Sequence, residues 1–120
     1  IKNNPAAHSW LEMNHSKGSV KSLSFKKPIS KNFLNDHATT GMFWFKNSIE
    51  FLAYLEIMIQ EGFGKKEKFY IDELINFYIK DNKVVRIIDV DYLCWGTPKD
   101  YEDYHSTISY WKAFKKAQKS

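Results

Sequence analysis

Two short runs near the N-terminus alternate between apolar and polar residues, which is the pattern of strands with one buried face. They cover residues 8–14 and 19–25 and are separated by His15-Ser16-Lys17-Gly18, whose polar residues and glycine suit a tight turn. The sequence therefore predicts a hairpin over residues 8–25.

The next segment changes from an irregular polar stretch to an apolar one. Residues 26–36 contain Pro28 and show no periodicity, so they predict a loop. Residues 38–45 follow, and the four apolar residues after Gly41 predict a buried strand.

Apolar residues at helical spacing then predict two helices. In the first, Asn47 is the N-cap, Glu50 follows three residues later, and Gly62 ends the helix. Its predicted apolar face consists of Phe51, Leu52, Leu55, Met58 and Ile59. The second helix carries Ile71, Leu74, Ile75, Tyr78 and Ile79 and stops at Asp81-Asn82.

The C-terminal third predicts one more strand and one more helix. Residues 84–90 are almost all apolar, which predicts a strand buried on both faces of a helix-covered sheet. The helix has Thr97 as its cap, Pro98 at its first position and Asp100 three residues after the cap. Its predicted apolar face carries Tyr101, Tyr104, Ile108 and Trp111. No repeat or linker interrupts the pattern, so we expect residues 1–120 to form a single α/β unit.

Composition narrows the class of protein. The chain has 120 residues, 43% hydrophobic and 17% aromatic, which suffices for one domain with a core and excludes disorder. No apolar run approaches the roughly 18 residues of a membrane-spanning helix, so we expect a soluble protein without membrane contact. The only cysteine, Cys94, cannot form an internal disulfide, which favours a reducing cytoplasm.

The positive charge is concentrated at the C-terminus. Eighteen basic residues against 14 acidic ones give a net charge of +4, and the last turns carry Lys112, Lys115, Lys116 and Lys119. Cations at a helix C-terminus complement the helix dipole, and the aromatic residues fall at core spacings. We therefore interpret the lysines as a solvated helix end and expect no nucleic-acid partner.

Several chemistry-bearing residues lack the pattern of a known site. The histidines, His8, His15, His37 and His105, do not have the spacing of zinc ligands. Nothing around Cys94 suggests a catalytic nucleophile. The segment Gly62-Phe63-Gly64-Lys65-Lys66 has glycines and cations suited to phosphate, but it closes a helix instead of opening one. We interpret it as a helix stop with a basic loop.

Three segments remain as candidate sites. Lys26-Lys27 stands at the end of a predicted strand, and Thr40-Gly41 opens another, where a missing side chain lets backbone approach a ligand. The third, residues 92–98, is a strand-to-helix turn ending at a capped helix N-terminus, which can bind an anion. For each segment a purely structural role is the alternative.

Four stretches, in this order, resemble the second half of a sugar-1-phosphate nucleotidyltransferase. They are residues 18–30 with Phe25-Lys26-Lys27-Pro28, residues 40–46 (Thr-Gly-Met-Phe-Trp-Phe-Lys), residues 69–76 (Phe-Tyr-Ile-Asp-Glu-Leu-Ile-Asn) and residues 95–100 (Trp-Gly-Thr-Pro-Lys-Asp). The first resembles the family's Glu-Lys pair followed by Pro, and the last its Gly-Thr-Pro-x-Asp. The resemblance runs from about Trp10 to Trp111.

The resemblance implies a partial Rossmann-like (GT-A-like) fold: a mixed sheet with flanking helices that lacks the N-terminal nucleotide-binding half. In this family a sugar-1-phosphate attacks the α-phosphorus of a nucleoside triphosphate and releases pyrophosphate, with Mg²⁺ offsetting charge. Lys26 is then the cation for the sugar phosphate, and the backbone at Thr40 and Gly41 lines the sugar pocket. Surface-glycan precursors are the usual products of such enzymes.

Departures from the family pattern leave two interpretations open. Phe25 replaces the acid before the lysine, Cys94 stands where many members have a magnesium-binding aspartate, and Lys68 replaces a glutamate. The glycine-rich nucleotide loop is missing, so we expect a C-terminal half that holds no cofactor and is inactive alone. The alternative is a non-catalytic assembly module that forms homo-oligomers through exposed apolar surface.

Overall fold

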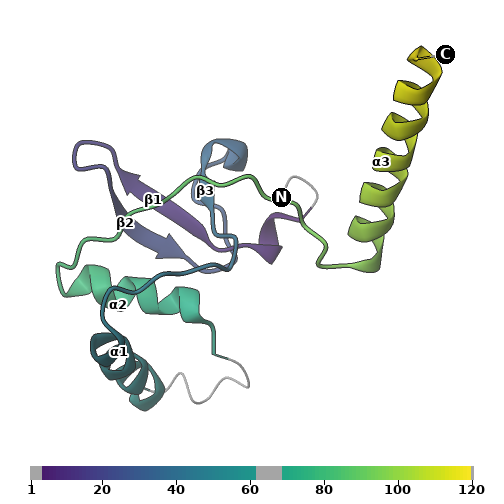
Figure 1. Ribbon diagram of the computed structural model, residues 1–120. Helices are drawn as coiled ribbons and strands as arrows, with labels where there is room; N and C mark the ends of the chain where they lie inside the picture. Colours follow the sequence, from purple (N-terminus) through teal and green to yellow (C-terminus); the bar gives the residue numbers. More distant parts are fainter. Residues whose placement is uncertain (1–3, 62–68, 120) are drawn as a thin grey trace. The chain divides into compact units, whose positions relative to one another are not determined.

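The computed structural model of the chain describes residues 4–61 and 69–119, and it divides into two compact units, residues 1–89 and 90–120 (Figure 1). We describe each unit by itself. The first unit contains η1 (Pro5–Ala7), β1 (Trp10–Asn14), β2 (Ser19–Ser24), η2 (Phe33–Asn35), β3 (His37–Ala38), α1 (Ser48–Gln60), η4 (Ile71–Glu73) and α2 (Leu74–Lys80). The second contains α3 (Pro98–Gln118). The described chain is thus a mixture of helices and strands, as predicted.

The predicted N-terminal hairpin is confirmed. β1 and β2 pair antiparallel with a bulge at Glu12/Met13, and Gly18 closes the turn with a φ of +60° that favours glycine. β3 pairs antiparallel with the other edge of β1, which gives the strand order β2-β1-β3. The prediction of a mixed sheet is therefore wrong for the described residues, because every pairing among them is antiparallel.

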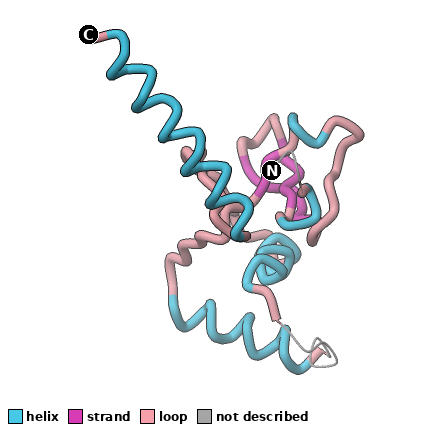
Figure 2. Tube along the Cα trace, turned by 90° about the vertical axis from the view of Figure 1, so that its right-hand side faces the viewer, coloured by secondary structure: helices cyan, strands magenta, loops and turns pink. Residues whose placement is uncertain are grey.

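Two predicted strands are absent. Residues 41–45 and 84–90 belong to no strand, and Figure 2 shows strand structure confined to the small hairpin sheet. The exposed fractions of Met42, Trp44 and Ile88 are 85%, 82% and 87%, so neither segment is buried on both faces. Apolar composition indicated burial, but a strand also needs a free sheet edge. The second segment contacts β2 through a hydrogen bond, in which the Val20 N–H donates to the Val85 carbonyl at 2.8 Å.

The first predicted helix forms and starts where expected. The side chain of Asn47 accepts hydrogen bonds from the N–H groups of Ile49 and Glu50, which satisfies two donors of the first turn of α1. The helix ends at Gln60, and the predicted stop at Gly62 lies outside the described residues.

The predicted apolar face of α1 is confirmed for Met58, Phe51 and Leu55, which are buried in the core cluster or pack against it, and is wrong for its other two residues. Tyr54 and Met58 are buried, whereas Leu52 and Ile59 are 55% and 49% exposed. The face is rotated toward Tyr54 because its ring packs on Tyr78 of α2, with the ring centroids 4.4 Å apart.

α2 also forms as predicted and lies between α1 and the sheet. Two of its three buried residues, Leu74 and Tyr78, form one cluster with Tyr54 and Met58 of α1. On its other side, the Asn76 side-chain amide accepts from the Leu23 N–H and donates to the Leu23 carbonyl, both at 2.9 Å. The unit is therefore layered as sheet, α2 and α1 (Figure 1).

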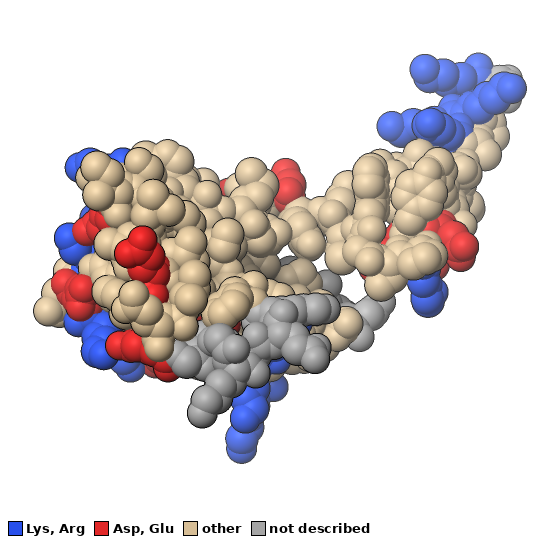
Figure 3. Space-filling view, turned by 90° about the horizontal axis from the view of Figure 1, so that it is seen from below, with Lys and Arg blue, Asp and Glu red and all other residues tan. Residues whose placement is uncertain are grey.

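The second unit is dominated by α3, whose predicted cap is confirmed. Thr97 and Asp100 form a reciprocal capping box, and Pro98 occupies the first turn. None of the residues of α3 is buried, and three of its four lysines, Lys112, Lys115 and Lys116, lie toward its C-terminal end, where Figure 3 shows a group of basic side chains. Among the described residues, no helix has the length and apolar character needed to cross a membrane.

Candidate functional site

The three residues predicted to bind substrate lie in loops that leave the same end of the sheet. Ser24 of β2 and Ala38 of β3 both face Trp10, one on each side of it. Lys26 follows Ser24 by two residues, and Thr40 follows Ala38 by two. Since neighbouring strands are spaced about 4.8 Å apart, the two loops leave the sheet roughly 10 Å from each other. The structure thus brings Lys26 and Thr40-Gly41 to one end of the sheet, with β1 between them.

Lys26 is an exposed cation held over aromatic rings. Its Nζ lies 4.7 Å from the ring centroid of Tyr70 and 5.5 Å from that of Phe25. The Tyr70 hydroxyl oxygen is 3.5 Å from the same Nζ. Within residues 4–61 and 69–119, no carboxylate lies within ion-pair distance of Lys26. The ammonium group is therefore positioned by the two rings and keeps its charge for an external anion.

Tyr70 is a candidate site residue that the sequence did not reveal. It lies immediately before η4, and its ring packs against Phe25 with a centroid distance of 4.9 Å and an interplanar angle of 50°. The resemblance covers residues 69–76, which include Tyr70, but it implied no role or partner for this residue. Tyr70 and Lys26 are 44 positions apart, and no local pattern encodes a contact between residues so distant in the chain.

The Thr40-Gly41 loop is anchored just before it. The Thr39 N–H donates to the Ser9 carbonyl at 2.9 Å, and Nδ1 of His8 lies 3.1 Å from the Thr39 carbonyl oxygen. Gly41 has a φ of +84°, where a side chain would be strained, and nothing lies within 4 Å of the place a Cβ would occupy. The backbone at Gly41 thus faces open space, as a ligand-lining glycine requires.

Ser9 connects the Thr40 side of the site to the Tyr70 side. Its side chain is buried and its hydroxyl donates to the carboxylate of Asp72, two residues after Tyr70. Its carbonyl accepts from Thr39, as described above. One buried residue therefore fixes both segments, and the sequence had no signal for Ser9 or Asp72 because they are 63 positions apart.

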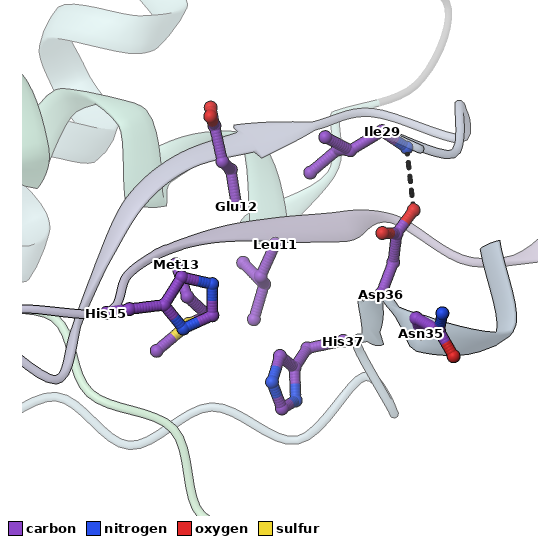
Figure 4. Close-up of a pocket in the computed structure, with 8 residues that line it drawn as sticks. All are labelled: Leu11, Glu12, Met13, His15, Ile29, Asn35, Asp36 and His37. Atoms are coloured by element: carbon purple, nitrogen blue, oxygen red, sulfur yellow. Dashed lines mark hydrogen bonds between the residues drawn. The ribbon is translucent and has the colours of Figure 1, made fainter. Parts of the chain in front are cut away.

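A separate pocket of about 280 Å³ lies on β1 and the loop before β3 (Figure 4). It is lined by Leu11, Glu12, Met13, His15, Ile29, Asn35, Asp36 and His37, and none of the three predicted site residues is among them. The Asp36 carboxylate accepts hydrogen bonds from the N–H groups of Ser30 and Ile29 within its own loop. These hydrogen bonds lower its pKa. The described residues contain no group of three His, Cys, Asp or Glu side chains that could hold a metal ion.

The turn before α3 is internally satisfied. The Cys94 thiol lies 3.7 Å from Oδ2 of Asp100, and this carboxylate also accepts from the Thr97 hydroxyl at 2.8 Å. The hydrogen bond from Thr97 lowers the pKa of Asp100. A Cβ on Gly96 would lie 3.4 Å from the Cys94 sulfur, so the turn is tightly packed there. Lys68 and the basic loop at residues 62–66 lie outside the described residues.

Comparison with models of protein families, with curated proteins and with solved structures gave no match. The function must therefore be argued from the residues at the sheet end.

Proposed function

We propose that the chain forms the sugar-1-phosphate-binding half of a sugar-phosphate nucleotidyltransferase with a Rossmann-like fold. The observation that carries the proposal is the position of Lys26, an exposed ammonium without a carboxylate partner in the described residues, at the sheet end shared with Thr40-Gly41. A lysine is a suitable point charge for a phosphate group.

The role of this half is to bind and position the acceptor. Lys26 binds the phosphate, and the open backbone at Thr40-Gly41 lines the sugar pocket. The phosphate oxygen of the bound sugar-1-phosphate then attacks the α-phosphorus of a nucleoside triphosphate held by the other half, and pyrophosphate leaves. Such a step gains its rate from positioning and electrostatics. No step is assigned to a metal, since the described residues hold no group of three His, Cys, Asp or Glu side chains that could bind one.

Backbone strain at Lys26 gives independent support. Its φ is +53°, in the left-handed region, where a residue with a side chain costs about 1–2 kcal/mol. Glycine would avoid this cost, so a lysine at this position lowers the stability of the fold. Strain of this kind is typical of functional positions.

Lys26→Ala tests the proposal. Isothermal titration of the chain with α-glucose 1-phosphate should show at least about tenfold weaker binding, because a hydrogen-bonded charge is lost. The melting temperature should stay nearly unchanged. Lys26→Gly should weaken binding equally and keep or raise the melting temperature, because it also relieves the left-handed strain.

Lys17→Ala is the matched control, since Lys17 carries the same charge in the turn at the opposite end of the hairpin. It should bind as the unaltered chain does. Equal losses of affinity in Lys17→Ala and Lys26→Ala would show that binding depends only on net charge, which would contradict the proposal.

A non-catalytic assembly module is the second candidate function. The exposure of Met42, Trp44 and Ile88 favours it, because such side chains are suited to burial against another chain. If the unaltered chain does not bind the sugar phosphate but sediments as a concentration-dependent dimer, this candidate replaces the first.

A further inference from the structure

The hydroxyl of Tyr70 has an unused donor beside Lys26. The Lys26 Nζ lies 3.5 Å from the Tyr70 oxygen, which is long for a hydrogen bond, so the two groups are adjacent without being tightly bound to each other. As the ammonium has no acceptor of its own, the tyrosine oxygen is its natural acceptor and the tyrosine proton stays available. Among the described residues, this proton finds no acceptor.

We infer that Tyr70 is a second phosphate-binding residue, which donates its hydroxyl proton to a phosphate oxygen of the ligand that Lys26 holds. The inference rests on the proposed function and extends it to a residue that the sequence did not identify. The ligand we infer is a phosphate ester or free phosphate, whose several oxygens can accept from both adjacent donors at once.

The surroundings of Tyr70 hold its hydroxyl in place. The Phe25 ring packs against one side, with the centroids 4.9 Å apart, and the Lys26 ammonium lies over the Tyr70 ring. The backbone two residues further on is fixed by the buried contact between Asp72 and Ser9. Because these contacts position the ring without using its proton, the hydroxyl is prepared for a ligand at little entropic cost.

Tyr70→Phe tests the inference, since it removes one oxygen and keeps the ring that packs on Phe25 and Lys26. The full chain is titrated with two probes, inorganic phosphate and α-glucose 1-phosphate. We expect roughly tenfold weaker binding of both probes by the same factor, as for a lost hydrogen bond to a charged group. The melting temperature should not change. Tyr110→Phe, on the exposed surface of α3, is the matched control and should bind both probes normally.

The outcomes separate this inference from the proposed function. If Lys26→Ala loses affinity and Tyr70→Phe does not, Tyr70 has no role in binding phosphate and the proposed function stands. If Tyr70→Phe weakens only the sugar ester, the hydroxyl contacts the sugar and the inference is wrong. If the unaltered chain binds neither probe, both proposals fail together.

Discussion

Tyr54 shows how one buried contact makes the stability of the protein depend on pH. Its hydroxyl donates to Asp81 at 2.7 Å, and this hydrogen bond to a carboxylate, together with burial, raises the pKa of Tyr54 to about 12. An unfolded tyrosine titrates near pH 10. The folded state therefore keeps a proton that the unfolded state has already lost.

The expected result is a loss of stability as pH rises from about 10 to 12, because stability falls with pH wherever the folded state binds more protons. Urea denaturation at a series of pH values should show a steeper decline for the unaltered chain than for Tyr54→Phe. Some decline remains in the variant, since burial also raises the pKa of Tyr78. Parallel declines in the two chains would contradict the assignment.

At the scale of single residues, the sequence predicts what is local. The caps at Asn47 and Thr97 were identified because each acts on N–H groups two or three residues away. Lys26 and Gly41 were selected from their immediate neighbours, and their substrate roles stay predictions. Ser9, Asp72 and Tyr70 could not be found in this way, because their contacts exist only after distant segments meet.

At the scale of elements, Asn76 completes the hydrogen bonding of a strand from within a helix. Its amide pairs with both backbone groups of Leu23, in the way a neighbouring strand would. The side chain thereby covers part of the outer edge of β2 and fixes α2 against the sheet.

Asn76→Ala should destabilise the chain by about 1 kcal/mol, the net value of an intramolecular hydrogen bond, with a small gain in helix propensity working against the loss. Chemical denaturation at neutral pH measures the change. Asn32→Ala is the control, because Asn32 also lies on the surface and its side chain caps nothing. Equal stability of the two variants would mean that the amide pairing contributes nothing.

The hydrophobic pattern predicted the hairpin and the helices correctly and two strands wrongly, because strand pairing depends on contacts between elements. Alternation and helical spacing placed β1, β2, α1 and α2 correctly, although the buried face of α1 includes Tyr54 and leaves Leu52 and Ile59 exposed. The runs at 41–45 and 84–90 were apolar enough for strands, but pairing depends on which sheet edges remain open. The outer edge of β2 is contacted by Asn76 and Val85, and this information is absent from either run.

At the scale of the whole chain, the core belongs to the first unit. The buried cluster of Tyr54, Met58, Leu74 and Tyr78 lies within residues 1–89, whereas α3 contributes none of the buried residues. The expectation that residues 1–120 form one unit stays a prediction that truncation can test.

A chain ending at Asp89 should keep a cooperative thermal transition within a few degrees of that of the full chain. It should also keep its affinity for α-glucose 1-phosphate, because Lys26, Thr40 and Gly41 are all in the first unit. Calorimetry and titration of the truncated chain measure both properties. A broad transition without cooperativity would show that residues 90–120 are needed for the fold.

The contacts along the outer edge of β2 determine at which edge the sheet can accept a further strand. The outward N–H groups of Val20 and Leu23 already have acceptors in Val85 and Asn76, so an incoming strand finds no template there. The opposite edge of the sheet is formed by β3, which is only two residues long, and such a strand could pair there. If a nucleotide-binding half completes this protein, it should join the sheet beyond β3. The triphosphate would then approach the sheet end from the side of Gly41. Lys26 would bind the acceptor phosphate from the opposite side, next to β2.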